Sequence, residues 1–476
     1  MKEDVWITTL CESQCADAPC LLRVHRVDGV AVGVEPNTQL EDFEHQVKNQ
    51  GRLCPKSFGV IQKIYNPNRI KGPLKRTNPE KGRGIDPKWV EISWDEAFDT
   101  IAERLKKVRA DDSRKLAEGG GIGAMRQAGW RPFFQAFGPT QSLIGGRSTR
   151  CDQSEHAFSN RIHGAFQCEP DLEHCNYLLL IGSNTSASGG TPEGVLFSDA
   201  RKRGMKTVVI DPVFSVTAAK ADEWLPIKPC TDLPFLLAMI NVIVHELDVY
   251  DAPYLKEMTN SPYLVGPDGY FARDKDSQKV LIWDSVDEKA KPYDDETIKD
   301  PGLEGVFKVE GKECRPAFQA LKDHVRGYTP EWASEITDIS DDTIRRVAGE
   351  WVENACIGSN IELDGKTLPY RPVATKLGRG PTGVMRSYQV VLANHVLAAL
   401  VGSIEVPGGH MGGSTLAKGK RKGDILWKQY GLDAGIIPGK DGMRDVHHYP
   451  FIWPPISYSA IETLCPMSDY AHAKPP

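Results

Sequence analysis

Residues 176–212, NYLLLIGSNTSASGGTPEGVLFSDARKRGMKTVVIDP, decide the fold class of this chain. Two apolar runs, at 177–181 and 206–210, are typical of strands buried on both faces. The segment between them has the composition of a helix and stops at Gly204, a residue type that commonly ends helices. A longer amphipathic segment follows at 231–247. This alternation of strand and helix predicts a parallel sheet with helices on its faces, and so an α/β fold class.

Glycine and polar residues follow both predicted strands. Gly182 and Asn184 come after the first strand, and Asp211 comes after the second. Ligands of parallel sheets bind beyond the carboxyl ends of the strands, where backbone N–H groups suit phosphate and a carboxylate suits ribose hydroxyls. The strict G-x-G-x-x-G fingerprint is absent, so an ordinary NAD site is not supported. These residues alone leave a nucleotide site and a plain α/β core equally open.

Composition places the chain among soluble multidomain proteins. It has 476 residues, 40% of them apolar and 26% charged, which predicts several domains. Its 58 Lys and Arg against 64 Asp and Glu give a net charge of −6, so no basic excess points to nucleic acid. The apolar stretches near 235–244 and 390–404 are too short or too interrupted to span a bilayer. With no export signal or twin arginine at the start, we expect a cytoplasmic protein that meets membranes through partners only.

Four of the eleven cysteines gather in the first 54 residues, at Cys11, Cys15, Cys20 and Cys54. Four thiolates can enclose a zinc ion or a cubane iron–sulfur cluster. After Cys20, an alternating run with a turn at Asp28-Gly29 predicts a β-hairpin that brings the chain back to deliver the fourth ligand. The spacing differs from the paired C-x2-C knuckles of zinc ribbons, and Lys56 follows Cys54 closely. A cluster is therefore favoured, and a structural zinc ion is the alternative.

Another cysteine, Cys151, lies in the stretch GGRSTRCDQSEHAFSNRIHGA at 145–165. The small and polar residues before it predict a loop that enters a helix. A thiolate at a helix N-terminus is stabilised by the helix dipole, which favours a metal-ligating cysteine. Seven cysteines lie outside the N-terminal group, so an idle cysteine is the alternative. His156 and His163 follow, and each is a candidate acid or base or simply a packed histidine.

These blocks together resemble the dimethyl sulfoxide reductase superfamily, the bis-molybdopterin-guanine-dinucleotide enzymes with an N-terminal [4Fe–4S] domain. The family pattern is C-x2/3-C-x3-C, a long gap, and a Cys followed shortly by Lys; this chain has one extra residue before Cys20. The stretch WVEISWDEAFDTIAERLKKV at 89–108, with Ser93 and Glu96 as a capping box, resembles the family signature just after the cluster domain. The resemblance implies a [4Fe–4S] cluster on the four cysteines, with Lys56 between cluster and pterin.

The resemblance extends to both cofactor-binding faces. IGSN, ARKRGMKTVVIDP and ADEWLPIKPCTDLPFLLAMINVI match the family's guanine-dinucleotide cradle. Cys230 stands where the family usually has Gly, while Asp232, expected to recognise guanine edges, is retained. The stretch KLGRGPTG, containing Gly378 and Gly380, precedes LAALVGSIEVPGGHMGG and resembles the second pterin-binding face. Flexible glycines there let backbone approach a large flat cofactor. A turn-rich loop region is the alternative.

The resemblance also implies which residues act at the metal. In the family, the protein ligand to molybdenum or tungsten lies in the stretch before the nucleotide lobe, which assigns Cys151 as the ligand and Ser148 as the runner-up. Cys151, Lys56 and His156 are therefore the expected catalytic residues. Asp17 lies inside the cluster loop, as does the carboxylate proposed to act in acetylene hydratase, a non-redox relative.

The implied fold is an α/β multidomain protein, with a small β-rich iron–sulfur domain and two α/β lobes of the dimethyl sulfoxide reductase type. The expected domains are a [4Fe–4S] domain at 1–70, a discontinuous α/β pterin-binding lobe at 71–150 with 330–476, and a Rossmann-like guanine-dinucleotide lobe at 151–329. Residues 262–312 are expected to form a surface insertion with short strands. The C-terminal β-barrel-like pterin domain of full-length relatives is missing, so we expect either a truncated product or a separate chain that supplies it.

The function implied by this resemblance is redox catalysis at a molybdenum or tungsten centre held by two pterin dithiolenes and Cys151. Electrons pass through the N-terminal cluster to a ferredoxin-like iron–sulfur subunit, and a membrane-anchor subunit is a further candidate partner. The substrate is expected to be an organic compound resembling an aryl-acetyl thioester, or a sulfur oxyanion. Two rivals are a non-redox hydratase of the acetylene hydratase type and a non-catalytic electron-transfer or scaffold subunit without pterin.

Overall fold

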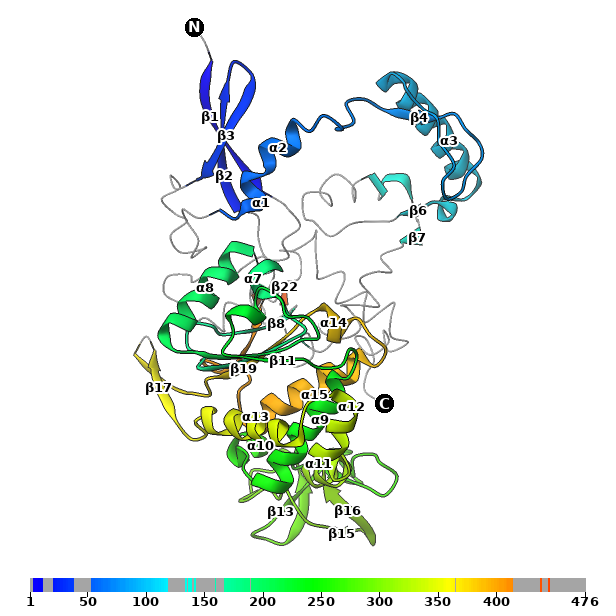
Figure 1. Ribbon diagram of the computed structural model, residues 1–476. Coiled ribbons are helices and arrows are strands. Elements are labelled where there is room, and N and C mark those ends of the chain that lie inside the picture. The colour runs from blue at the N-terminus through cyan, green and yellow to red at the C-terminus, as the bar shows by residue number, and fades with distance from the viewer. Residues whose placement is uncertain are drawn as a thin grey trace. The chain divides into compact units, whose positions relative to one another are not determined.

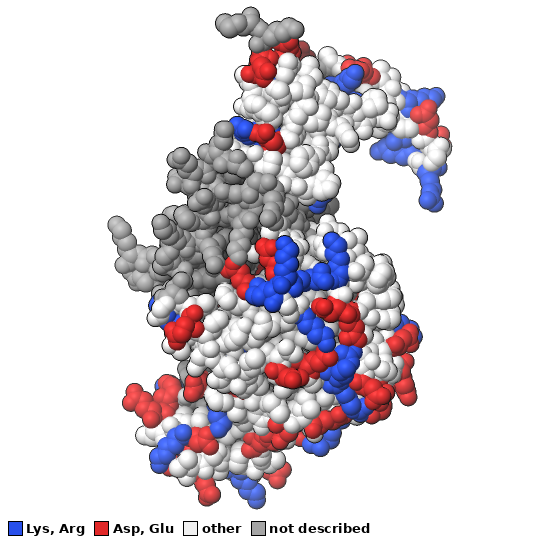
Figure 2. Space-filling view, turned by 60° about the vertical axis from the view of Figure 1, so that its left-hand side comes forward, with Lys and Arg blue, Asp and Glu red and all other residues white. Residues whose placement is uncertain are grey.

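The computed structural model describes residues 3–11, 20–37, 53–118, 133–134, 136–138, 141–142, 159, 167–188, 190–363, 365–413, 437–438 and 444–445. The chain divides into two compact units (Figure 1). The N-terminal unit comprises Met1–Ser148 with Val446–Pro476, and the α/β unit comprises Thr149–Asp445. On the face shown in Figure 2, basic and acidic residues are interspersed over the described surface of the α/β unit, in line with the nearly balanced composition.

The N-terminal unit begins with a three-stranded antiparallel sheet in the order β1-β2-β3. Its strands are β1 (Asp4–Cys11), β2 (Cys20–Val27) and β3 (Val30–Pro36). The predicted hairpin forms between β2 and β3, and Asp28 and Gly29 at its turn both have positive φ, 49° and 82°, as two-residue hairpin turns require. Two short helices, α1 (Pro55–Phe58) and α2 (Val60–Ile64), contact β3.

The rest of this unit contains the capped helix that the sequence predicts. A hairpin of β4 (Leu74–Arg76) and β5 (Trp89–Glu91) precedes α3 (Trp94–Asp112). The Ser93 hydroxyl accepts a hydrogen bond from the Glu96 backbone N–H at 3.1 Å. The Glu96 carboxylate does not complete the capping box, because it pairs with Lys75 at 2.8 Å. The short elements η2 (Ser113–Lys115), β6 (Ala117–Glu118) and β7 (Gln141–Ser142) follow.

The α/β unit is built on a four-stranded parallel sheet in the order β11-β10-β9-β19. Its strands are β9 (Tyr177–Ile181), β10 (Lys206–Ile210), β11 (Glu223–Leu225) and β19 (Val373–Leu377). Every residue of β9 is buried, because the strand has a neighbour on each side and helices on both faces. The predicted parallel sheet and the α/β multidomain class are confirmed. β19 comes from far along the chain and was not predicted as a strand.

Helices cover the two faces of this sheet (Figure 1). One face carries α8 (Gly190–Arg203), whose Phe197 and Ala200 pack on the sheet's apolar side chains. The other face carries the larger core, which includes Phe235, Trp351 and Leu397. Its helices are α9 (Asp232–Asn241), α10 (Ala252–Met258), α11 (Ala317–Val325), α12 (Pro330–Thr337), α13 (Asp341–Asn354) and α15 (Ser387–Leu400). The shorter α7 (Thr185–Ser188), η4 (Ala218–Lys220) and α14 (Arg379–Thr382) lie in connections.

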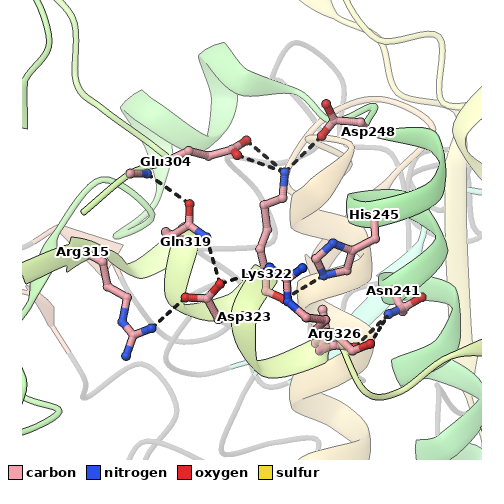
Figure 3. Close-up of polar contacts among 11 residues, drawn as sticks. Asn241, His245, Asp248, Glu304, Arg315, Gln319, Lys322, Asp323 and Arg326 are labelled. Atoms are coloured by element: carbon pink, nitrogen blue, oxygen red, sulfur yellow. Dashed lines mark hydrogen bonds and ion pairs between the residues drawn. The ribbon is translucent and has the colours of Figure 1, made fainter.

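The predicted helix at 231–247 changes type part-way. After α9 the chain continues as a π-helix, Val242–Leu247, and ends at Asp248 in the left-handed conformation, φ 50°. Figure 3 shows the polar contacts at this junction. His245 Nε2 donates to the Lys322 carbonyl at 2.8 Å, and the Lys322 ammonium pairs with Asp248 and Glu304 at 3.1 and 3.0 Å. The π-helix, whose turns are wider than those of an α-helix, is thus accompanied by side-chain contacts to α11. The apolar pattern of residues 231–247 does not predict these contacts.

The predicted insertion at 262–312 consists of short strands, as expected. They are β12 (Leu264–Val265), β13 (Leu281–Asp284), β14 (Lys289–Pro292), β15 (Phe307–Val309) and β16 (Lys312–Pro316). Lys291 is buried at its centre, and its ammonium donates to Asp284 at 2.7 Å, Asp287 at 2.6 Å and the Thr297 carbonyl at 2.7 Å. All three ammonium protons thus have acceptors, which offsets the cost of burying the charge.

Three two-stranded pairings complete the described elements. They are β8 (Gln167–Pro170) with β20 (His410–Gly413), β17 (Asn360–Leu363) with β18 (Lys366–Pro369), and β21 (Ile437–Pro438) with β22 (Arg444–Asp445). Among the described residues, no single helix is long and apolar enough to cross a membrane. The helix pair Asp232–Leu247 and Ala252–Met258, bent by 119°, meets that test only when taken together.

Candidate functional site

The cluster cysteines lie at one end of the N-terminal sheet. Cys11 is the last residue of β1, Cys20 is the first of β2, and the two are cross-strand partners in the register. The segment that contains Cys15 and Asp17, 12–19, lies outside the described residues. The register between β1 and β2 is unbroken from Asp4 to Cys11, so the strand pairing places Cys11 opposite Cys20.

Cys54 lies at the N-terminus of α1, next to Lys56. Burial opposes ionisation of Cys54, but backbone hydrogen bonds from Ser57 and Lys56, the Ser57 hydroxyl and the Lys56 charge together lower the pKa of its thiol. The thiolate is the form that binds metals, so this environment suits a ligand. Among the described residues, no three His, Cys, Asp or Glu side chains converge to hold a metal ion, and Cys15 and Cys151 are not among those residues.

The two glycine-bearing loops predicted to bind cofactor meet at the carboxyl edge of the parallel sheet. The Gly378 N–H donates to the Ile181 carbonyl, and the Gly182 N–H donates to the Ile210 carbonyl, both at 2.8 Å. A Cβ at Gly378 would lie 1.7 Å from the Gly182 oxygen, and a Cβ at Gly182, where φ is +59°, would lie 2.4 Å from Pro381 Cδ. These two positions therefore need glycine, because a Cβ at Gly378 would meet the Gly182 backbone and a Cβ at Gly182 would meet the Pro381 ring.

Gly380 behaves differently from its neighbour. A Cβ built at this residue meets nothing within 4 Å. Glycines in the following GGHMGG stretch are again close-packed: a Cβ at Gly408 would lie 2.6 Å from Pro372 Cα, and one at Gly409 would lie 2.4 Å from the Ser403 oxygen. Internal packing therefore already requires glycine at three positions, Gly378, Gly408 and Gly409. The prediction that these stretches approach a cofactor stays a prediction.

Asn184 links the loops that follow β9 and β10. Its side-chain oxygen accepts a hydrogen bond from the Thr217 hydroxyl at 2.7 Å, and the same hydroxyl oxygen accepts from the Ser186 backbone N–H at 2.9 Å. Both loops belong to the edge where ligands of parallel sheets bind. Asn184 therefore holds this edge in shape through its side chain.

Two buried carboxylates face the same edge. Asp211 follows β10 and is 9% exposed, and its Oδ1 accepts from the Val213 N–H at 2.8 Å. Asp232 is the first residue of α9 and is 7% exposed. Burial raises the pKa of Asp232, and the nearby charge of Asp211 raises it further. A pair of buried acceptors favours a ligand that brings N–H or O–H donors, such as a ribose or a base edge.

Cys230 has a glycine-like backbone. Its φ is +66° and its side chain is exposed, a conformation that costs a non-glycine residue roughly 1–2 kcal/mol. The Thr231 hydroxyl donates to the Lys228 carbonyl at 2.6 Å across this turn. The left-handed turn is thus kept in this chain with cysteine in place of glycine, and Asp232 keeps its position at the start of α9.

Comparison with known proteins identifies the family. The model of the molybdopterin oxidoreductase family matches residues 69–448. The chain belongs to this family. A sulfite dehydrogenase subunit of Allochromatium vinosum is 33% identical over 421 residues, which cover 82% of this chain and 42% of that protein. Dimethyl sulfoxide reductase DmsA of Escherichia coli is 28% identical over 432 residues, covering 85% and 44%.

A further relative and a solved structure agree with this assignment. The arsenate respiratory reductase molybdopterin-containing subunit of a Shewanella species is 27% identical over 411 residues, covering 85% of this chain and 41% of that protein. Acetylene hydratase from Pelobacter acetylenicus has the same fold with a TM-score of 0.56 at 22% identity, over 86% of this chain and 45% of that one. The chain thus spans less than half the length of these relatives, and the resemblance to the dimethyl sulfoxide reductase superfamily is confirmed.

Several predicted residues of this family member lie outside the described part of the chain. They are Cys15, Cys151, His156, the runner-up Ser148, His163 and Asp17. Their roles stay predictions. Lys56, Cys54, Cys11 and Cys20 belong to the N-terminal unit, whereas Gly182, Asn184, Asp211, Asp232, Gly378 and Gly380 belong to the α/β unit.

Other residues that shape the carboxyl edge of the parallel sheet were not predicted. Thr217 ties the two loops together, and the Trp224 indole N–H donates to the Asp211 carbonyl at 2.8 Å. His410 reaches across to β19, where its Nε2 lies 3.0 Å from the Thr375 N–H. Trp224 and His410 both lie in stretches that resemble the family, but neither their spacing nor their residue type indicated which groups they contact.

Proposed function

We propose that this chain is the nucleotide- and cluster-bearing part of a molybdenum- or tungsten-dependent oxidoreductase that uses a bis-molybdopterin guanine dinucleotide cofactor. The observation that carries the proposal is the carboxyl edge of the parallel sheet, where Gly182, Gly378 and the acidic pair Asp211 and Asp232 converge. Membership of the molybdopterin oxidoreductase family supports it. So do the chain's relatives, which include a sulfite dehydrogenase subunit and reductases of dimethyl sulfoxide and arsenate.

In this proposal the α/β unit holds the dinucleotide. Asp232 accepts hydrogen bonds from the guanine edge, Asp211 accepts from a ribose hydroxyl, and backbone N–H groups after β9 meet phosphate. The Gly378–Gly380 stretch lies along the pterin. When bound, the molybdenum or tungsten centre supplies the two-electron chemistry. Cys151 is its protein ligand, and His156 holds or releases a proton beside it.

The N-terminal unit serves as the electron port in this proposal. Cys11, Cys15, Cys20 and Cys54 hold a [4Fe–4S] cluster, and Lys56 places a positive charge close to the ligand Cys54. The matched register of Cys11 and Cys20 and the lowered pKa of Cys54 support this assignment. Electrons are exchanged with a ferredoxin-like iron–sulfur subunit, and a membrane-anchor subunit is a further partner.

The proposal is tested by analysing the chain together with its co-purifying partners, isolated without oxygen. We expect molybdenum or tungsten, guanine nucleotide released by acid, and about four iron atoms per chain. Iron without molybdenum, tungsten or guanine would contradict the proposal and favour an electron-transfer or scaffold subunit. Turnover that needs no electron acceptor would contradict the redox assignment and favour a hydratase.

Among substrates we propose a sulfur oxyanion, because the sulfite dehydrogenase of Allochromatium vinosum is 33% identical to this chain. The purified complex should reduce a dye when sulfite is added, or oxidise a reduced dye when a more oxidised sulfur oxyanion is added. Activity with aryl-acetyl thioesters and none with sulfur oxyanions would overturn this choice and leave the cofactor assignment intact.

A further inference from the structure

The loop after β10 exposes three apolar side chains close in the chain to the buried carboxylate of Asp211. Val213, Phe214 and Val216 are 64%, 61% and 54% exposed. They follow Asp211 directly, at the edge where the proposed nucleotide binds. We call Val213, Phe214 and Val216 the apolar shelf. Exposed apolar side chains next to buried polar acceptors are typical of a site whose ligand has an apolar face and polar groups at its edge.

The loop that carries the shelf is held rigid. The Ser215 N–H donates to the Val213 carbonyl at 2.8 Å, and the Ala219 N–H donates to the Ser215 carbonyl at 2.9 Å. Thr217 ties the far end to Asn184 and Ser186. The apolar side chains are therefore displayed by a loop whose backbone is already ordered, so a ligand would not have to order it on binding.

Phe214 is held by an aromatic neighbour. Its ring packs edge-on against Trp224, with centroids 5.0 Å apart and planes at 63°. Trp224 in turn donates its indole N–H to the Asp211 carbonyl at 2.8 Å. An edge-on contact covers only part of each ring, so the Phe214 ring stays 61% exposed. Its position is fixed by Trp224, which is itself hydrogen-bonded to Asp211.

We propose that Phe214 is the base-stacking residue of the nucleotide site and that Val213 and Val216 flank it. This inference rests on the proposed function. There Asp232 accepts hydrogen bonds from the edge of the base; here Phe214 contacts the flat face of the same base. The occupant has to combine a flat apolar face with N–H donors, since the neighbouring buried groups are carboxylate acceptors. Guanine meets both requirements, whereas adenine carries no ring N–H on its pairing edge and matches the acceptors less well.

The test is calorimetric titration of the full 476-residue chain, freed of bound nucleotide, with GDP and with ADP. Phe214→Ala is expected to weaken GDP binding by about tenfold, the scale of base–aromatic stacking. Phe214→Tyr retains the aromatic face and should bind GDP as the wild type does. Tyr270→Ala, which removes another exposed aromatic ring from the 262–312 insertion, is the matched control and should change nothing.

Each other outcome overturns the inference. GDP binding that is equal in Phe214→Ala and wild type would exclude stacking on Phe214 and leave the nucleotide site standing. A lower melting temperature for Phe214→Ala with unchanged GDP affinity would mean that the shelf is a packing surface for protein. No GDP binding by the wild type, or equal binding of ADP, would remove the guanine site itself and the proposed function with it.

Discussion

At the scale of single residues, glycine decides how the carboxyl edge of the parallel sheet is built. Gly182 and Gly378 touch through their backbones, and Gly182 also has a positive φ of 59°. No other residue type lacks the Cβ that each contact excludes. The two loops are therefore joined before any ligand arrives, and the edge of the sheet is preorganised.

Gly378→Ala tests this contact. The added Cβ would fall 1.7 Å from the Gly182 oxygen, so the two loops must separate, and we expect the free energy of unfolding to fall by about 2 kcal/mol or more. Gly380→Ala is the matched control, because nothing lies within 4 Å of its new Cβ. Urea denaturation measures both. Equal stability of the two variants would show that the loops do not touch as described.

Cys230 offers a second test at the same scale. Replacing it with glycine removes the strain of φ +66° but adds flexibility to the unfolded chain, so we expect Cys230→Gly to be about 0.5–1 kcal/mol more stable than Cys230→Ala. Cys230→Val should be the least stable of the three, since a β-branched residue tolerates positive φ poorly. Thermal unfolding ranks them, and a reversed order of Gly and Ala would refute the turn geometry.

At the scale of elements, polar side-chain contacts stabilise two local structures, a π-helix and the 262–312 insertion. The π-helix at Val242–Leu247 meets α11 through the His245 hydrogen bond to the Lys322 carbonyl (Figure 3). The insertion combines a small apolar cluster around Leu264 and Leu281 with the buried ammonium of Lys291 and its three acceptors. In both cases the local structure depends on polar contacts that the apolar pattern of the sequence does not show.

The insertion makes stability depend on pH. The hydrogen bond from Lys291 and backbone N–H groups of Lys299 and Val286 hold the pKa of Asp284 well below its usual range. A depressed folded-state pKa stabilises the fold above the unfolded value of 3.8, and this contribution is lost as pH falls below it toward the folded value.

Asp284→Asn should therefore be less stable than wild type at pH 7, and the difference should shrink as the pH falls below about 4. The measurement is the free energy of unfolding of each protein at several pH values. Asp276→Asn, at an exposed position in the same insertion, is the control and should show little difference at any pH. A gap between Asp284→Asn and wild type that stays constant down to about pH 2 would contradict the ion pair.

The β1–β2 pair carries a prediction about the cluster. If Cys11 and Cys20, which are register partners, both bind iron, then Cys11→Ser and Cys20→Ser should each lose most of the bound iron and the visible absorbance of the cluster. Cys356→Ser, in the α/β unit, should keep both. Full retention of iron in the Cys11 and Cys20 variants would exclude these two ligands. Zinc in place of iron in the wild type would restore the structural-zinc alternative.

At the scale of the whole chain, local features were predicted well and long-range ones were not. The hairpin at Asp28-Gly29, the helix that Ser93 caps, and the strands 177–181 and 206–210 were all predicted from neighbouring residues. The position of β19 beside β9 was not, because the paired residues Val373 and Tyr177 are far apart in the sequence. Within the helix that Ser93 caps, α3, the apolar residues Phe98 and Ile101 stay 61% and 55% exposed.

The candidate site divides in the same way. Gly182, Asn184 and Asp211 were singled out as residues that follow strands, Gly378 as part of a glycine-rich stretch, and Asp232 through the family resemblance. Their convergence on one edge depends on β19, and the roles of Thr217, Trp224 and Phe214 depend on contacts across loops. No periodicity marks a residue whose partner lies in another loop.

The sequence by itself determined the α/β class, the parallel strands β9 and β10, the cysteine group and the family, because each of these is written in consecutive residues or in a spacing. Only the tertiary structure decided that the first strand loop and the second glycine stretch touch at Gly182 and Gly378, that the charge of Asp211 acts on Asp232, and that Phe214 is left exposed beside them. The physical reason is that hydrophobic periodicity reports which face of an element is buried. It does not report which distant strand buries that face, so the edge where a ligand binds is set by pairing between remote segments.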